Sequence, residues 1–242
     1  MDKPRIYCIM VTNKTRKHFL PIALKNFAEQ TYINKVLIII NHSPEEKLII
    51  EPIKNVHEFL VDKTQQNFTL GQLRNIALDG FVPEGGLWTT NDDDDYKHPT
   101  YLEEFIRRLT FHNLDLLFLK NRLEINLNNG FIFRSQFKKG WAFFIAKKYR
   151  DYKYLDLDTM EDKNVRDEYK KNDKKIATFN NDPNLYIRTI HNTNTSIFVV
   201  NTKNSIVNYS EDNNYREFDA TYEEKKYVNN IIDSYYKDLK KY

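Results

Sequence analysis

Short apolar runs and segments of helical periodicity alternate along the first half of the chain. Residues 5–11 and 35–40 are short, apolar and rich in β-branched side chains, which predicts two buried strands. Between them, apolar positions recur at helical spacing over residues 19–30, with Pro21 in a first turn, where proline is tolerated. This order of strand, helix and strand is typical of a parallel sheet with crossover helices.

The same alternation predicts the rest of an α/β fold. We expect a third strand at 57–61, a helix at 70–78, a fourth strand at 86–90 and a helix that begins after Pro99 and continues to about Leu109. The second half is less regular and predicts a mixed extension of the sheet, with strands near residues 115–119, 122–127, 130–133, 140–146, 175–179 and 185–190. Residues 221–239 place their apolar side chains on one face, which predicts a closing amphipathic helix.

Four consecutive aspartates, residues 92–95, follow the predicted fourth strand directly. Ligands collect at the carboxyl ends of strands in open α/β sheets, so these acids stand where a site is expected. A calcium loop of the EF-hand type is excluded, because Lys97 stands where that loop requires glycine and Pro99 follows two positions later. A solvated acidic turn remains one interpretation. The other is a Mg²⁺ or Mn²⁺ site, in which the cation offsets the repelling carboxylates and links them to substrate phosphates.

Motifs along most of the chain resemble, in order, those of the family 2 glycosyltransferases with the GT-A fold. The acidic run followed by Pro99 resembles the family's DxD element, with Asp92 and Asp94 as the two motif aspartates and Asp95 as an additional acid. Further segments that resemble family motifs are residues 11–16, 29–32, 70–77, 140–144, 160–162 and 191–195.

Two departures from the family pattern stand out. Leu73 replaces the alanine of the helix motif, and residues 41–43 read Asn-His-Ser where the family usually has an acidic turn. The missing carboxylate commonly accepts a hydrogen bond from uracil, so the inference of a uracil base is weakened.

The resemblance implies one GT-A domain over residues 1–242, with a nucleotide-sugar half (1–110), an acceptor-side half (111–220) and a C-terminal helix (221–242). It also implies a metal-dependent, inverting transfer of sugar from a nucleotide-diphosphate sugar, foremost a UDP-sugar, to a hydroxyl on a glycan or glycoconjugate. A sugar-nucleotide pyrophosphorylase is a rival, but residues 11–16 lack the glycine-rich loop that it requires. A catalytically silent sugar- or nucleotide-binding module is the second rival, and the retention of Asp94 and Asp162 argues against it.

The resemblance assigns roles residue by residue. Asp162 is the implied general base, although an acid before a helix is also favoured by the helix dipole. The implied donor-binding residues are Thr12, Asn13, Arg16, Asn41, Arg74, Asp92 and Asp93. The implied ligands of Mn²⁺ or Mg²⁺ are Asp94, Asp92 and His191. The implied acceptor-binding residues are Trp141, Glu161 and Asp95.

Three of these residues have a second interpretation that the sequence leaves open. Arg74 could pair with a fold-supporting carboxylate as well as with a diphosphate. His191 could be a hydrogen-bonded loop histidine, and Trp141 could be a core aromatic.

Composition narrows the class of protein. The 37 basic and 34 acidic residues nearly balance, which argues against nucleic acid as the main partner. The sequence contains no transmembrane-length apolar run and its first residues lack a signal-peptide core, so we expect a soluble, cytoplasmic protein. Abundant Asn, Lys, Ile and Tyr with only six Gly suggests an AT-rich genome, such as that of a large virus or of certain bacteria. For a viral protein, the expected location is the host cytoplasm. The sequence leaves the oligomeric state open.

Overall fold

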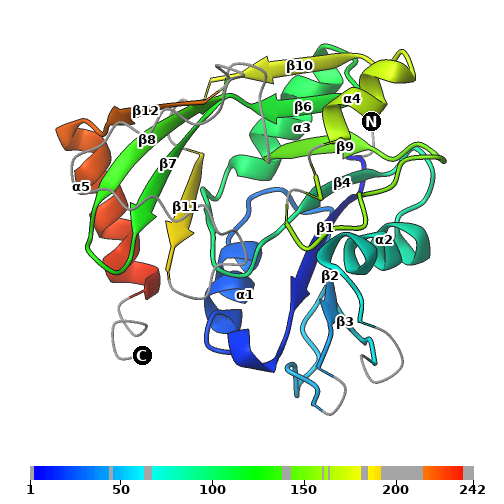
Figure 1. The fold of residues 1–242 in the computed structure, drawn as a ribbon, viewed down its shortest axis with the longest axis horizontal. Helices are drawn as coiled ribbons and strands as arrows, with labels where there is room; N and C mark the ends of the chain where they lie inside the picture. Colours follow the sequence, from blue (N-terminus) through cyan, green and yellow to red (C-terminus); the bar gives the residue numbers. More distant parts are fainter. Residues whose placement is uncertain are drawn as a thin grey trace.

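Two β-sheets organise the chain in the computed structural model, which describes residues 3–43, 46–62, 67–137, 143–159, 161–162, 164–180, 185–191 and 215–236 (Figure 1). The first sheet contains seven strands: β1 (Ile6–Thr12), β2 (Lys35–Asn41), β3 (Val56–Leu60), β4 (Leu87–Thr90), β6 (Leu116–Leu119), β9 (Phe144–Lys147) and β10 (Ile176–Phe179). Their order across the sheet is β10-β6-β9-β4-β1-β2-β3. Every predicted strand of the first half is therefore confirmed.

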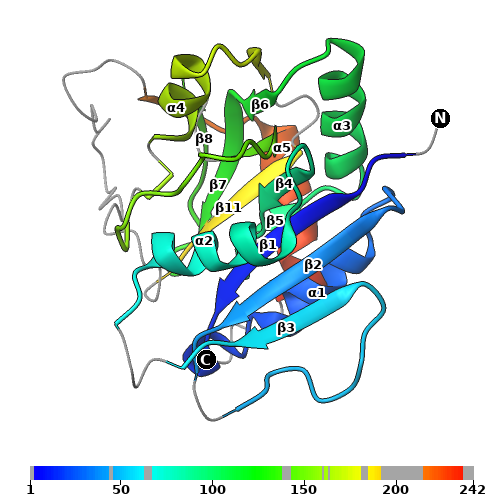
Figure 2. The same cartoon turned by 90° about the vertical axis from the view of Figure 1, so that its right-hand side faces the viewer.

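The pairing of these strands creates a topological switch point. Strand β1 pairs in parallel with β2 on one side and with β4 on the other, and β2 pairs in parallel with β3. The chain therefore builds β1, β2 and β3 outward in one direction and then returns to place β4 on the opposite side of β1 (Figure 2). Ligands bind at the carboxyl ends of strands at such a point.

Helices cover both faces of the first sheet because each presents an apolar face to it. Helices α1 (Leu20–Ala28) and α3 (Tyr101–Phe111) pack on one face, and α2 (Leu70–Phe81) and α4 (Val165–Lys171) on the other. Helix α2 begins with a capping box, in which the Thr69 hydroxyl accepts from the Gln72 N–H (3.2 Å) and the Gln72 side chain accepts from the Thr69 N–H (3.0 Å). Trp88 is fully buried in the same hydrophobic cluster as Leu73 and Leu78 of α2.

The second half of the chain both extends the first sheet and forms a second one. Strands β6, β9 and β10 continue the first sheet, as the predicted mixed extension required. The second sheet, in the order β12-β8-β7-β11-β5, consists of β5 (Tyr96–Lys97), β7 (Asn121–Asn126), β8 (Ile132–Phe137), β11 (Tyr186–Ile190) and β12 (Tyr215–Asp219). The sequence did not predict this separate sheet, nor its strands β5 and β12.

Helix α5 (Tyr222–Ile231) covers one face of the second sheet and continues as a π-helical turn, Ile232–Tyr236. Val228 and Ile232 pack there against Leu123 and Ile187. The predicted closing helix is thus confirmed up to Tyr236, and the rest of that segment lies outside the described residues. None of the helices in the described part of the chain combines the length and apolar character that a bilayer span requires.

Candidate functional site

The carboxyl ends of β1, β2 and β4 converge at one edge of the first sheet. Thr12 and Asn41 are register partners at the ends of β1 and β2, and the acidic run follows β4 beside them. The N–H of Asn91 donates to the carbonyl of Ile9 (2.7 Å), and residues 92–95 then leave the sheet before the chain enters β5. The four carboxylates therefore project from irregular backbone at the switch point.

Asp93 is held inside the protein by the end of β1 and the turn that follows it. Its side chain is 2% exposed, and one oxygen accepts a 2.6 Å hydrogen bond from the Thr12 hydroxyl. Arg16 donates to both carboxylate oxygens, at 2.5–3.0 Å. Asn13 fixes the short helical turn that carries this arginine, because its side-chain oxygen accepts from the Thr15 N–H (2.9 Å).

Asp94 meets a histidine and an arginine at one oxygen. Its Oδ2 lies 2.8 Å from Nε2 of His191, the residue after β11, and 2.8 Å from Nη2 of Arg16. Burial alone would raise the pKa of Asp94, but the hydrogen bond with His191 and the charge of Arg16 outweigh it and lower the pKa to about 2. The His191 ring also packs on Phe19, with 4.6 Å between ring centroids. The structure therefore brings together two of the three residues implied as metal ligands.

Asp92, the third implied ligand, forms an ion pair with Arg74, and Arg74 forms a second ion pair with Glu161. The Asp92 side chain is 39% exposed, and Oδ1 accepts a 2.9 Å hydrogen bond from Nη2 of Arg74 on α2. Nη1 of the same guanidinium pairs with the carboxylate of Glu161, which is 5% exposed. Arg74 thus connects the acidic run to Glu161. The next residue is the half-buried Asp162, whose carbonyl accepts from the Val165 N–H (3.1 Å) at the start of α4.

The carboxyl group of Glu161 has a raised pKa. Burial raises its pKa strongly, the charge of Arg74 lowers it, and nearby Asp162 raises it again, with a net pKa of about 7. The Arg74 guanidinium is itself buried, yet the carboxylates around it raise its pKa, so it stays charged. The interpretation of Arg74 as the partner of a fold-supporting carboxylate therefore has a direct structural basis.

Two implied site residues point into networks of the protein itself. Asp95 accepts hydrogen bonds from the Tyr186 hydroxyl (2.5 Å) and the Thr189 N–H (2.9 Å), and burial raises its pKa well above the usual value. Asn41 is fully buried, and its side chain donates to Glu58 (2.8 Å) on the neighbouring strand β3. Trp141, implied in acceptor binding, lies outside the described residues.

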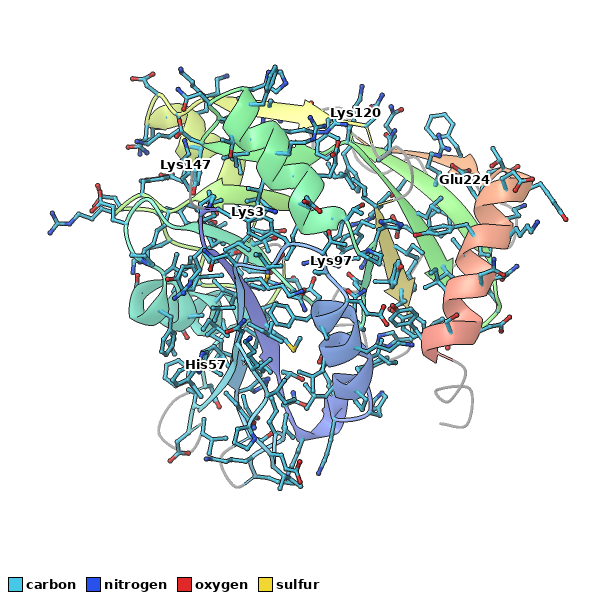
Figure 3. The ribbon with its side chains drawn as sticks, turned by 180° about the vertical axis from the view of Figure 1, so that it is seen from behind. Lys3, His57, Lys97, Lys120, Lys147 and Glu224 are labelled. Atoms are coloured by element: carbon cyan, nitrogen blue, oxygen red, sulfur yellow. The ribbon has the colours of Figure 1, made fainter. Side chains whose placement is uncertain are left out.

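The sequence did not predict the role of Lys97. Its side chain, 3% exposed, donates to the carbonyl of Thr90 and to the side chain of Asn91 (3.1 Å) directly before the acidic run, at the junction of the two sheets (Figure 3). Burial lowers its pKa, and the charges of Asp92 and Asp95 oppose that effect. The sequence did contain one sign of this role, since Lys97 stands two positions after four consecutive acids.

The charge of the acidic run is therefore partly balanced by the chain. Arg16, Arg74 and Lys97 contribute three basic groups next to four carboxylates. The chain itself therefore supplies part of the positive charge that the sequence analysis assigned to a metal ion, and the metal ion stays a prediction.

The residues present nevertheless fit a divalent cation. Adjacent ligands of an octahedral ion with bonds of roughly 2.1 Å lie about 3 Å apart, which is close to the 2.8 Å between Asp94 Oδ2 and His191 Nε2. Within the described residues, no group of three or more His, Cys, Asp or Glu side chains is arranged so that it could hold a metal ion. Mg²⁺ usually keeps several waters and binds one or two carboxylates together with substrate phosphates. The pair therefore suits an ion shared with a diphosphate.

Comparison with solved structures identifies the fold. No family model and no curated protein matches the chain. S. aureus TarS 1–349 in complex with UDP-GlcNAc aligns over 79% of this chain and 60% of its own, with a TM-score of 0.60 and 16% identity. The UDP complex of the same fragment aligns over 77% and 60%, with a TM-score of 0.58 and 17% identity.

A longer S. aureus TarS structure aligns over 77% of this chain, with a TM-score of 0.57 and 16% identity, and this chain spans 37% of its length. TarS is a GT-A-like glycosyltransferase. Together with the mostly parallel sheet and its flanking helices, these similarities show that the chain has the GT-A fold.

Proposed function

We propose that this protein is a glycosyltransferase of the family 2 type, which moves a sugar from a UDP-sugar to a hydroxyl on a glycan or glycoconjugate with inversion at the anomeric carbon. The observation that carries the proposal is the arrangement at the switch point, where the Asp94–His191 pair and the Asp92–Arg74–Glu161 bridge flank one edge of the sheet. The similar fold of TarS, whose structures hold UDP and UDP-GlcNAc, supports a nucleotide-sugar donor.

The donor would bind at the ends of β1, β2 and β4. The turn after β1 presents Asn13 and Arg16 there, and both are kept in place by hydrogen bonds within the protein. Mn²⁺ or Mg²⁺ held by Asp94 and His191 would supply positive charge that stabilises the departing diphosphate. Arg16, which is half-buried, and Arg74, which is buried, both remain charged and contribute fixed positive charge at the same edge.

Asp162 would act on the acceptor. As the acceptor oxygen forms its bond to the anomeric carbon, the bond from that carbon to the diphosphate oxygen breaks on the opposite face, and Asp162 takes the hydroxyl proton. Glu161 is held by Arg74 and thereby anchors the backbone next to this base. In this mechanism the Arg74 bridge positions the base relative to the donor.

The test begins with a panel of UDP-sugars and Mn²⁺. Calorimetry measures binding, and release of UDP measures slow transfer to water. We expect Asp94→Asn to abolish metal-dependent donor binding and Asp162→Asn to leave binding intact and stop turnover. Asp151→Asn, an exposed acid outside the site, is the matched control and should behave as wild type.

Two results would contradict the proposal at different levels. Normal turnover by Asp162→Asn would show that the base is misassigned, while the reaction class would stand. Failure of the wild-type protein to bind any UDP-sugar of the panel in the presence of Mn²⁺ would remove the proposed function itself.

A further inference from the structure

The backbone of the acidic run is held by side-chain hydroxyls instead of by a sheet. Residues 92–95 belong to no strand, although strands precede and follow them. The carbonyl of Asp94 accepts one hydrogen bond from the Thr189 hydroxyl (2.7 Å) and a second from the Tyr236 hydroxyl (2.9 Å). A carbonyl oxygen has two lone pairs, so these two donors satisfy it fully. Thr189 is 0% and Tyr236 1% exposed, which keeps water from replacing either donor.

Both hydroxyls come from firmly placed elements. Thr189 lies on β11, two residues before His191, and the N–H of Thr189 also holds the Asp95 carboxylate (2.9 Å). Tyr236 ends the π-helical turn after α5, 142 residues along the chain from Asp94, and packs in the core between α5 and the second sheet.

The same turn is attached to helix α1. Lys25 Nζ donates to the carbonyl of Ser234 (3.3 Å), and the Tyr235 hydroxyl donates to Glu29. Figure 1 shows α5 running along the second sheet towards α1. The turn is thus fixed from two sides, and the Tyr236 hydroxyl has a defined position.

We infer that Tyr236 and Thr189 are positioning residues, which fix the backbone of Asp94 and so determine where its carboxylate meets a divalent cation. This inference rests on the proposed function, in which Asp94 and His191 bind that cation. Backbone dihedrals set the direction of a short side chain such as aspartate, so a carbonyl held at both lone pairs leaves the carboxylate little freedom. Thr189 lies on β11 and His191 directly follows that strand, so the same segment that holds the Asp94 carbonyl also carries the second ligand.

The direct test measures Mn²⁺ affinity by electron paramagnetic resonance, without nucleotide and with UDP. Groups that hold a metal ligand in place typically contribute 10- to 100-fold to affinity, so we expect Tyr236→Phe and Thr189→Val each to weaken Mn²⁺ binding about 10-fold. Thr189→Ser keeps the hydroxyl and should bind Mn²⁺ as wild type does. Tyr235→Phe is the matched control, because it removes a hydroxyl from the same turn that contacts α1 and not Asp94.

A double variant separates positioning from general destabilisation. Tyr236→Phe with Thr189→Val leaves the buried Asp94 carbonyl without either donor, so the combined loss of Mn²⁺ affinity should exceed the product of the two single losses. Urea unfolding of every variant shows which of them are folded. If Tyr236→Phe does not fold, the Thr189→Val and Thr189→Ser pair decides the question.

The possible failures are distinguishable. Wild-type Mn²⁺ affinity in folded Tyr236→Phe and Thr189→Val would overturn the inference and leave the proposed function standing. Equal losses of stability in Tyr235→Phe and Tyr236→Phe with unchanged Mn²⁺ affinity would show a structural role and overturn the inference as well. A wild-type protein that binds Mn²⁺ neither alone nor with UDP would remove the proposed function, and this inference with it.

Discussion

The Arg74 guanidinium joins the acidic run to Glu161, and replacing Arg74 by methionine tests that bridge. Methionine keeps a long flexible side chain of similar length and removes the charge. Glu161 would then remain 5% exposed without the guanidinium that now pairs with it, and Asp92 would lose its 2.9 Å hydrogen bond. Removing one partner of a buried ion pair costs roughly 3–5 kcal/mol, because the other charge is left uncompensated.

The pKa of Glu161 makes this cost depend on pH. Its folded-state pKa of about 7 lies above the ordinary value of 4.5, so this residue makes the protein less stable as pH rises through that interval. Without Arg74 the pKa rises further, and each unit of that rise costs about 1.4 kcal/mol at pH values above both pKa values. At pH 5 Glu161 is mostly protonated in both proteins, and this part of the cost disappears. Arg74→Met should therefore be destabilised more at pH 8 than at pH 5.

Urea unfolding at the two pH values measures this difference. Arg107→Met is the matched control, because Arg107 forms an exposed ion pair with Glu104 (2.8 Å) on α3 and should leave the unfolding midpoint nearly unchanged at both pH values. Adding Glu161→Gln to Arg74→Met should recover part of the loss at pH 8, since the unpaired charge is gone. Equal destabilisation at pH 5 and pH 8, or a loss no larger than that of Arg107→Met, would refute the bridge.

Further predictions concern packing and acid stability. A Cβ at Gly71 would lie 1.7 Å from the carbonyl oxygen of Leu155. Gly71→Ala must therefore push α2 away from the segment before Glu161, and it should lower the free energy of unfolding, measured in urea, by about 2 kcal/mol. Gly80→Ala, on the same helix with open space around it, should be neutral or stabilising. The lowered pKa of Asp94 stabilises the folded protein above pH 4. About 2 kcal/mol of the free energy of unfolding should therefore be lost as the pH falls from 3.8 to 2. The free energy of unfolding of Asp94→Asn, measured over the same pH range, should show no such loss.

The fold could be predicted from the sequence where each element carries its own pattern. Strand β2 is a continuous apolar run and α2 has both a capping box and an apolar stripe, so local sequence was sufficient for them. Strand β5 has only two residues and exists because it pairs with β11, about ninety residues away along the chain. The division of the later strands between two sheets likewise depends on pairing partners, which periodicity does not encode.

The site could be predicted only as a set of residues. The family resemblance placed Thr12, Asn41 and the aspartates in one donor site, and the strands that carry them do end at the same edge of the sheet. The sequence did not predict which side chains pair with these groups, since Asp94 and His191 are 97 residues apart and Arg74 and Glu161 are 87 residues apart. The sequence gave no sign of the role of Tyr236, which is one of 16 tyrosines. Its hydroxyl reaches the Asp94 carbonyl only because of the way α5 packs.

The balance of charge changes how a divalent cation would act in this site. The sequence suggested that the cation offsets four aspartates, but Arg16 already pairs with Asp93 and Asp94, and Arg74 already pairs with Asp92. A bound diphosphate would add new negative charge that these pairs do not offset. Under the proposed function, the cation therefore compensates the diphosphate more than the protein, and its affinity should rise when the nucleotide binds. Binding of the two ligands would then be coupled through the Asp94 carboxylate, whose position depends on the second sheet and α5.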